Sequence, residues 1–405
     1  MNENAPDSGD SEPPPVRLGL VLFAAGFVTF SLLYSVQPLL PSFAIEFARE
    51  PATVSLTLSV STAALAVGML LAAPLSERFG RTAVMKIALI SSSLLALAVP
   101  LCHDFGLLLG VRALLGVALS GVPAVAMAYL TEEIPPAKAG GAIGLFISGN
   151  AIGGMSGRMI TGFLTDHFSW RVALLVLAVV SLTTSVWFVL HLPPSRRFSP
   201  RPLDLKTWRA GFQASVEDPG LLCLYGVAFL LMGSFVSLYN YVTFLLMGPP
   251  FDLTHAQVSG VFLLYLVGTF SSPWGGRLGD RFGRRRVLWV AICVQLAGAF
   301  WTLGPGLIMK IFGIAIFTFG FFAAHALAGS WVGLRALANS GSASAVYLFA
   351  YYVGSSLAGT LGGVFWSRSG WPGVVAMIAL LLAAGIALAL RLTAIPPVTN
   401  APARI

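Results

Sequence analysis

The stretch that decides the fold is GRLGDRFGRRR (276–286), an acidic, arginine-rich turn that follows a long apolar run. A shorter copy, LSERFGR (75–81), occurs 203 residues earlier and also follows an apolar run. A second set of residues repeats at nearly the same offset, because Gly153, Gly162 and Trp170 match Gly354, Gly363 and Trp371. These repeats predict two related halves in the same orientation.

The composition predicts an integral membrane protein. Hydrophobic residues make up 57% of the chain and charged residues only 10%, against about 25% charged residues in a soluble domain. A bilayer core takes about 20 apolar residues in a helix. Gly, Pro and charge clusters divide the chain into twelve such spans, roughly 18–43, 52–74, 83–101, 106–130, 139–165, 169–191, 221–247, 256–276, 287–303, 306–330, 341–366 and 371–391.

The basic residues predict the orientation of these spans. With both termini in the cytoplasm, eighteen of the 24 lysines and arginines fall on the inner side, and Arg112 and Arg158 fall inside spans. Only Arg49, Arg171, Lys310 and Arg368 fall on the outer side. Cytoplasmic loops are the ones enriched in Lys and Arg. We therefore expect a multi-pass protein of the cell inner (plasma) membrane with cytoplasmic termini.

The polar stretches predict the domain boundaries. Residues 1–17 are acidic and proline-rich and are expected to form a disordered cytoplasmic tail. Two six-helix bundles follow, at 18–191 and 221–391, with a cytoplasmic tail at 392–405. The segment 192–220 is expected to link them through an amphipathic helix, which lies either on the inner leaflet or as an ordinary surface helix between the bundles.

At 276–286 the chain resembles the major facilitator superfamily, whose loop reads G-x-L-a-D-r-x-G-r-k-r, and within it the twelve-span drug:proton antiporter group. The first copy departs from that pattern at Ala73 and Glu77. The resemblance implies an all-α integral membrane fold, with twelve transmembrane helices in two pseudo-symmetric six-helix bundles. It also implies alternating access to one central site, in a protein that acts as a monomer.

The repeated turn predicts a latch between the bundles at the inner side. A carboxylate there can accept charge-assisted bonds from arginines only when the bundles close, which makes the contact two-state. The expected gating residues are Glu77, Arg78, Arg81, Asp280, Arg281 and Arg284. The alternative is that the basic residues anchor the loop to anionic lipid.

Two spans carry further motifs of that group. Span four has Leu108-x-x-x-Arg112-x-x-Leu115-Gly116, and an arginine at membrane depth is a functional candidate. Arg112 is therefore expected either to couple transport to protons or to bond backbone carbonyls. Span five resembles the antiporter motif G-P-x-x-G-G with Asn150 in place of the proline, so its glycines serve either substrate exit or helix packing.

The chain lacks a carboxylate in the middle of a span, where proton antiporters of this group usually carry one. His325 in span ten is the titratable alternative, as a proton relay or as a packing residue. Glu46 and Arg158, both expected toward the outer side, form a second alternative as an exchangeable pair.

Polar and aromatic residues of spans one, five, seven and eleven are the substrate-binding candidates, since the resemblance places these spans around the site. They are Tyr34, Gln37, Asn150, Arg158, Tyr239, Asn240, Tyr241, Tyr347, Tyr351 and Tyr352. Amides and hydroxyls among aromatic rings suit an amphipathic or sugar-like solute. Embedded arginines without embedded acids leave a neutral or anionic substrate open.

The function expected from these features is secondary export of a small amphipathic solute in exchange for protons. The alternative is a proton-independent facilitator or uptake carrier for a sugar or small organic anion. The sequence has no phosphate loop, H-E-x-x-H or G-x-S-x-G motif, so we expect no enzyme. No cofactor, metal site or nucleic-acid partner is indicated, and the expected partners are the solute, protons and the bilayer.

Overall fold

The computed structural model describes residues 15–196, 198, 205–336 and 340–396, and nearly all of them are helical. The elements, in chain order, are α1 (Pro15–Tyr34), η1 (Gln37–Leu39), α2 (Leu40–Glu46), α3 (Pro51–Phe79), α4 (Arg81–Ala98), η2 (Val99–Leu101), α5 (Phe105–Leu119), α6 (Ala126–Glu133), α7 (Pro136–His167), α8 (Trp170–His191), α9 (Leu205–Glu217), α10 (Pro219–Met247), α11 (His255–Ser259), η3 (Gly260–Leu264), α12 (Tyr265–Phe282), α13 (Arg284–Trp301), α14 (Leu307–Ala336) and α15 (Ser340–Ala394).

Every span expected from the sequence falls on these helices. Spans one, four and eight each contain two α-helices, which a 3-10 helix joins in spans one and eight, and spans eleven and twelve are joined in α15, which breaks at Gly370 with φ 58°. Within the described residues, seven helical stretches are long and apolar enough to cross a membrane by themselves. The other spans are shorter, or carry more glycine and charge.

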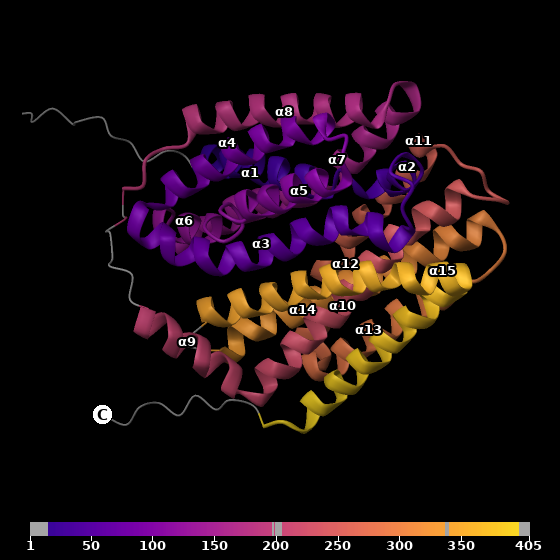
Figure 1. Ribbon diagram of the computed structural model, residues 1–405. Coiled ribbons are helices and arrows are strands. Elements are labelled where there is room, and N and C mark those ends of the chain that lie inside the picture. Colours follow the sequence, from indigo (N-terminus) through magenta and orange to yellow (C-terminus); the bar gives the residue numbers. More distant parts are fainter. Residues whose placement is uncertain (1–14, 197, 199–204, 337–339, 397–405) are drawn as a thin grey trace, which may run out of the picture.

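The helices form two bundles (Figure 1). Helices α1 to α8 make up the first and α10 to α15 the second, while α9 lies at one end of the molecule. We call this end, which also carries the turns at Gly80 and Gly283, the linker end, and the opposite end the far end. Helix α1 begins at Pro15, inside the segment expected to be a tail, and residues 1–14 and 397–405 lie outside the described part.

The two repeated turns have the same backbone conformation. Gly80 has φ 98° and ψ 139°, and Gly283 has φ 87° and ψ 127°. These positive φ values are costly for residues with a side chain, which explains the glycine in both copies. The sequence repeat therefore corresponds to a structural repeat.

The repeated glycines of α7 and α15 pack against the first helix of each bundle. A Cβ atom on Gly153 would overlap the backbone of Phe27 in α1, and one on Gly354 would overlap the backbone of Phe229 in α10. Glycine lets two helix backbones approach closely. The packing of α7 on α1 is thus repeated by α15 on α10.

The two bundles contact each other in their far halves. Gly162 of α7 packs on Ser259 of α11, and Gly363 of α15 packs on Ala52 of α3, with no room for a Cβ atom at either glycine. Ser59 of α3 also accepts hydrogen bonds from α15. Figure 1 shows α2, α7 and α11 meeting at this end, whereas α6 and α9 lie apart at the linker end.

Candidate functional site

The first transmembrane span breaks where its helix α1 ends at Tyr34. The chain continues through the 3-10 turn η1 into α2, and Pro38 in this turn has no N–H to donate. The break leaves backbone carbonyls of the last turn of α1 without their helical partners. It also places Tyr34 and Gln37 at the interface between the bundles.

Arg112 of α5 donates hydrogen bonds to these carbonyls. Its Nη1 and Nη2 donate to the backbone oxygens of Leu32 (3.0 Å) and Leu33 (2.7 Å), and its Nε donates to that of Thr57 (2.8 Å). The side chain is 1% exposed. All three nitrogens thus bond the backbone, which favours the structural alternative for Arg112 over proton coupling.

Arg158 of α7 lies at the centre of a buried group that both bundles build. Its Nε donates to Gln37 Oε1 (2.6 Å), and Gln37 Nε2 donates across the interface to Asn240 Oδ1 (2.7 Å). Three aromatic rings surround the guanidinium carbon, with centroids 4.2 to 5.0 Å away. We call this set the Arg158 cluster; its members are Tyr34, Gln37, Arg158, Asn240, Phe262 and Tyr265.

The rings of Phe262 and Tyr265 were missed by the sequence analysis. They belong to η3 and α12, in span eight, which was not among the spans expected to line the site. Their only signal was aromatic character, which ordinary core residues share. Their positions depend on how the second bundle packs against α7.

A second group of predicted residues lies together in the second bundle. His325 Nδ1 is 2.9 Å from the Tyr347 hydroxyl, and the His325 ring packs on that of Tyr351, with centroids 4.7 Å apart. Tyr351 in turn packs on Tyr352. His325 and Tyr351 are half-buried. The predicted tyrosines of α15 and the histidine of α14 therefore form one group, which we call the His325 cluster.

The other predicted substrate residues hold helices together. The Tyr239 hydroxyl bonds that of Thr318 (2.8 Å) and the Tyr241 hydroxyl donates to the backbone oxygen of Gly359 (2.7 Å), in each case within the second bundle. Asn150 packs against Gly26 of α1. These contacts are typical of helix packing for the two tyrosines, whereas the buried Asn150 Oδ1 has no hydrogen-bond partner among the described residues.

A polar contact at the far end joins the bundles, and sequence analysis did not predict it. The Asp166 carboxylate of α7 accepts from the backbone N–H groups of His255 (2.9 Å) and Ala256 (2.8 Å), at the start of α11. His255 Nε2 lies 2.6 Å from the Ser42 hydroxyl of α2. We call this set the far-end lock. A carboxylate here complements the positive end of the α11 helix.

Glu46 does not pair with Arg158 as the sequence suggested. It bonds Arg171 and the indole nitrogen of Trp170, all at the far end. The physical reason is depth, since Arg158 lies about two and a half turns from the end of α7 at His167, and helices rise about 1.5 Å per residue. Glu46 instead ties α2 to α8 within the first bundle.

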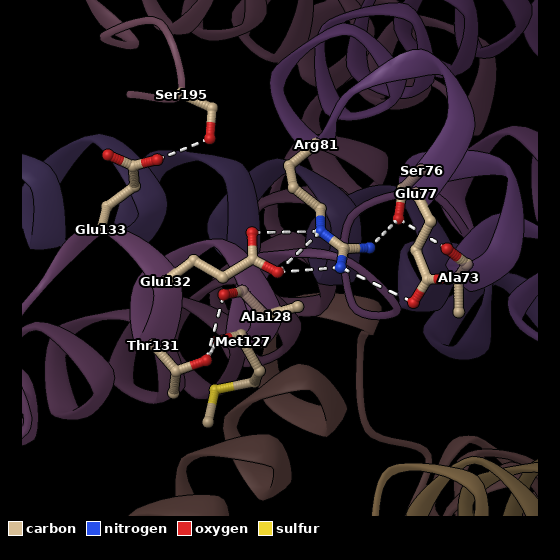
Figure 2. Close-up of polar contacts among 10 residues, drawn as sticks. All are labelled: Ala73, Ser76, Glu77, Arg81, Met127, Ala128, Thr131, Glu132, Glu133 and Ser195. Atoms are coloured by element: carbon tan, nitrogen blue, oxygen red, sulfur yellow. Dashed lines mark hydrogen bonds and ion pairs between the residues drawn. The ribbon is translucent and has the colours of Figure 1, made fainter. Parts of the chain in front are cut away.

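At the linker end, the predicted gating residues bond within their own bundles (Figure 2). Arg81 pairs with Glu132 of α6 (2.8 Å) and lies 3.8 Å from Glu77. In the second bundle, Asp280 pairs with Arg284 (3.0 Å) and is largely exposed. Glu132 was not singled out from the sequence, because its contact with Arg81 spans 51 residues of chain.

Arg78 and Arg281 occupy equivalent places in the two turns. The Arg78 guanidinium lies 5.4 Å from the Phe79 ring, and that of Arg281 lies 5.1 Å from the Phe282 ring. Each arginine thus covers the phenylalanine that follows it. The described residues contain no group of histidines, cysteines and acids that would hold a metal ion.

Comparison with known proteins agrees with this architecture. The family model described as Major Facilitator Superfamily matches residues 22–359 and 250–404. The chain belongs to the major facilitator superfamily. The chain is 47% identical to the uncharacterized MFS-type transporter YybF of Bacillus subtilis (strain 168), over 90% of this chain and 91% of YybF.

Two further proteins are similar to this chain, one in sequence and one in fold. The inner membrane transport protein YnfM of Escherichia coli (strain K12) is 47% identical over 94% of this chain and 91% of its own. The crystal structure of the nucleoside transporter NupG (D323A mutant) has the same fold, with a TM-score of 0.77 at 15% identity over 93% of this chain and 99% of NupG. The chain is therefore a multi-pass transporter of this superfamily.

Proposed function

We propose that this transporter exports a small amphipathic solute by alternating access, in exchange for protons. The observation that carries the proposal is the Arg158 cluster, which both bundles build at their interface. A site shared in this way changes its access when the bundles rock. The proposed bundles are residues 18–191 and 221–391, and the unit of transport is a monomer.

The charges support an orientation. The basic turns at 78–81 and 281–286 lie at the linker end, and Lys and Arg concentrate on the cytoplasmic side of membrane proteins. The linker end and both termini would then be cytoplasmic, in the same membrane as the name of YnfM indicates. With the far-end lock formed, the state described here would face the cytoplasm.

Proton exchange through His325 is supported by its place in the second bundle. Its Nδ1 bonds the Tyr347 hydroxyl, and the acids of the described spans lie near helix ends rather than at this depth. Protonation makes both ring nitrogens donors, so it would reorganise the hydrogen bond with Tyr347. A change on one helix would thereby reach α15, which also contacts the first bundle.

Inverted membrane vesicles test this proposal. Candidate amphipathic solutes should accumulate when a proton gradient is imposed, and His325→Gln should remove that dependence while His191→Gln should not. His191 is a suitable control because it lies at the end of α8, is half-buried, and contacts the ring and the backbone oxygen of Trp187 on its own helix. Accumulation that persists after the gradient collapses would exclude proton-driven export.

The second candidate is a facilitator or uptake carrier for a sugar or small organic anion. It is favoured by Arg158, which has no acidic partner in the part of the chain described here. Counterflow in proteoliposomes distinguishes the two. Exchange at equal rates across a range of pH, with no response to a proton gradient, would favour this candidate.

A further inference from the structure

The Arg158 cluster keeps a positive charge away from solvent without a carboxylate beside it. Arg158 is 1% exposed. Glu46 and Asp166, the acids on neighbouring parts of the first bundle, are engaged with Arg171 and His255. Removing an ion from water costs several kcal/mol of desolvation free energy, and without a counter-ion beside it most of that cost is not offset. An anion that reached the cluster would recover part of it.

One donor in the cluster lacks an acceptor. Arg158 Nε can only donate, so it fixes Gln37 with its oxygen toward Arg158 and its amide nitrogen toward Asn240. Asn240 must then present its oxygen to Gln37. Its Nδ2 group is fully buried and has no hydrogen-bond partner among the described residues. An unpaired buried donor costs about 1 to 3 kcal/mol.

Three aromatic rings define the rest of the environment. Tyr34 comes from the first bundle, and Phe262 and Tyr265 come from the second. Their flat apolar surfaces favour a ring or another apolar body. They already face the Arg158 guanidinium, so a cationic solute would meet a like charge where its own cation–π contacts would form.

We propose that the Arg158 cluster binds a monovalent organic acid with an aromatic or apolar body. The carboxylate of such an acid pairs with the Arg158 guanidinium, and Asn240 Nδ2 supplies a further donor from the other bundle. One negative charge neutralises the single uncompensated positive charge. The inference rests on the proposed function, because it takes this cluster as the site of the transported solute, and it narrows the amphipathic solute to an acid.

Ligand binding to the full-length protein in lipid nanodiscs tests this inference. Saturation-transfer difference NMR would compare benzoate with benzamide and benzamidine, which share its ring but are neutral and cationic. 2-Naphthoate and 2-naphthamide extend the comparison to a larger ring. We expect the two acids to bind at least tenfold more tightly than their amides, and benzamidine not to compete with them.

Variants assign that binding to the cluster. Arg158→Gln should weaken acid binding at least tenfold, Arg158→Lys should weaken it less, and Asn240→Ala should weaken it a few-fold. Arg171→Gln is the matched control, since it removes an arginine that is paired with Glu46 outside the cluster. Thermal unfolding of each variant verifies its fold. If the Arg158 variants do not fold, the difference in affinity between acids and amides for the unaltered protein still tests the inference.

Amides that bind as tightly as acids, the absence of acid binding, or unchanged binding in a folded Arg158→Gln would each overturn the inference. Transport is measured separately in proteoliposomes. Acid binding that depends on Arg158, combined with transport that ignores the proton gradient, would leave this inference standing and reject proton exchange.

Discussion

Replacing Asp166 with alanine tests the far-end lock. Its carboxylate accepts two backbone hydrogen bonds at the start of α11, on the other bundle. A helix cap contributes about 1 kcal/mol, and a hydrogen bond to a charged group about 1.5 to 3 kcal/mol. The Asp166 side chain is 18% exposed, so water replaces part of this loss. We expect Asp166→Ala to destabilise the state with the far end closed by about 1.5 kcal/mol. This corresponds to a roughly tenfold shift of the equilibrium away from that state.

Spin labels across the far end measure this shift. Exposed positions 49 and 368 lie on different bundles and would carry the labels after the native cysteines, Cys102, Cys223 and Cys293, are replaced. Double electron–electron resonance should show a larger population of long distances in Asp166→Ala. The matched control is Asp104→Ala, since Asp104 caps α5 within the first bundle. Identical distance distributions in the unaltered protein and in both variants would refute the role of the lock.

The same labels report the pH dependence of the lock. Burial raises the pKa of Asp166, but hydrogen bonds from Thr254 and from the start of α11 outweigh it and hold the pKa below its usual value of 3.8. Asp166 therefore stays ionised in the lock at any pH above that value. Burial lowers the pKa of His255 from 6.5, against the opposing effect of Asp166.

The direction of the pH effect depends on whether His255 binds a proton more weakly in the closed lock or in the open state. His255 binds protons less readily in the lock than in water, so the lock loses stability as the pH falls below about 6.5. We expect the long-distance population to grow between pH 7 and pH 5. His255→Gln should remove most of this growth, and a distance distribution that is the same at both pH values would contradict the assignment.

Four further substitutions follow from single contacts. Arg112→Gln should lower the free energy of unfolding by about 3 kcal/mol, because buried carbonyls lose their donors, and thermal unfolding in detergent would measure it. Gly162→Val should open the far end in the spin-label assay, since its side chain would overlap the other bundle. Glu132→Gln should lower the free energy of unfolding by about 2 kcal/mol, because the nearly buried Arg81 keeps only its longer contact with Glu77, and thermal unfolding would again measure it. Asp280→Asn should slow transport at normal expression, and unchanged turnover in vesicles would count against the latch.

Much of the fold was predictable from local sequence. Apolar runs of bilayer length fix where helices lie, and the turns at Gly80 and Gly283 revealed the repeat because their backbone conformation requires glycine. The repeated Gly153 and Gly354 marked helices whose backbones approach closely. The apolar runs and the glycine turns act through residues near one another in sequence, and the packing glycines repeat in both halves, so composition and spacing expose them.

The candidate site was predictable only in part. Arg158, Gln37 and Asn240 were identified because polar groups at membrane depth are rare. Their mutual bonds, and the addition of Tyr265, depend on how two bundles meet. Arg112 met the same criterion, yet its partners are carbonyls freed by the break in α1, and single residues do not reveal such a backbone detail.

The far-end lock was not predicted for a related reason. Asp166 and His255 lie at helix ends, where charged residues are common and carry no special signal. Their contact becomes informative only once the two bundles are placed side by side. Sequence therefore predicts candidate groups at membrane depth better than it predicts contacts between bundle ends.

Alternating access requires the two bundles to rock about the Arg158 cluster. Spin-label distances test this motion most directly. They would be measured at both ends of the protein in nanodiscs, with and without benzoate, and at neutral and lowered pH. We expect conditions that lengthen the far-end distance to shorten the distance between the linker-end turns at residues 79 and 282. Distances that lengthen together at both ends, or that stay fixed under all conditions, would contradict it.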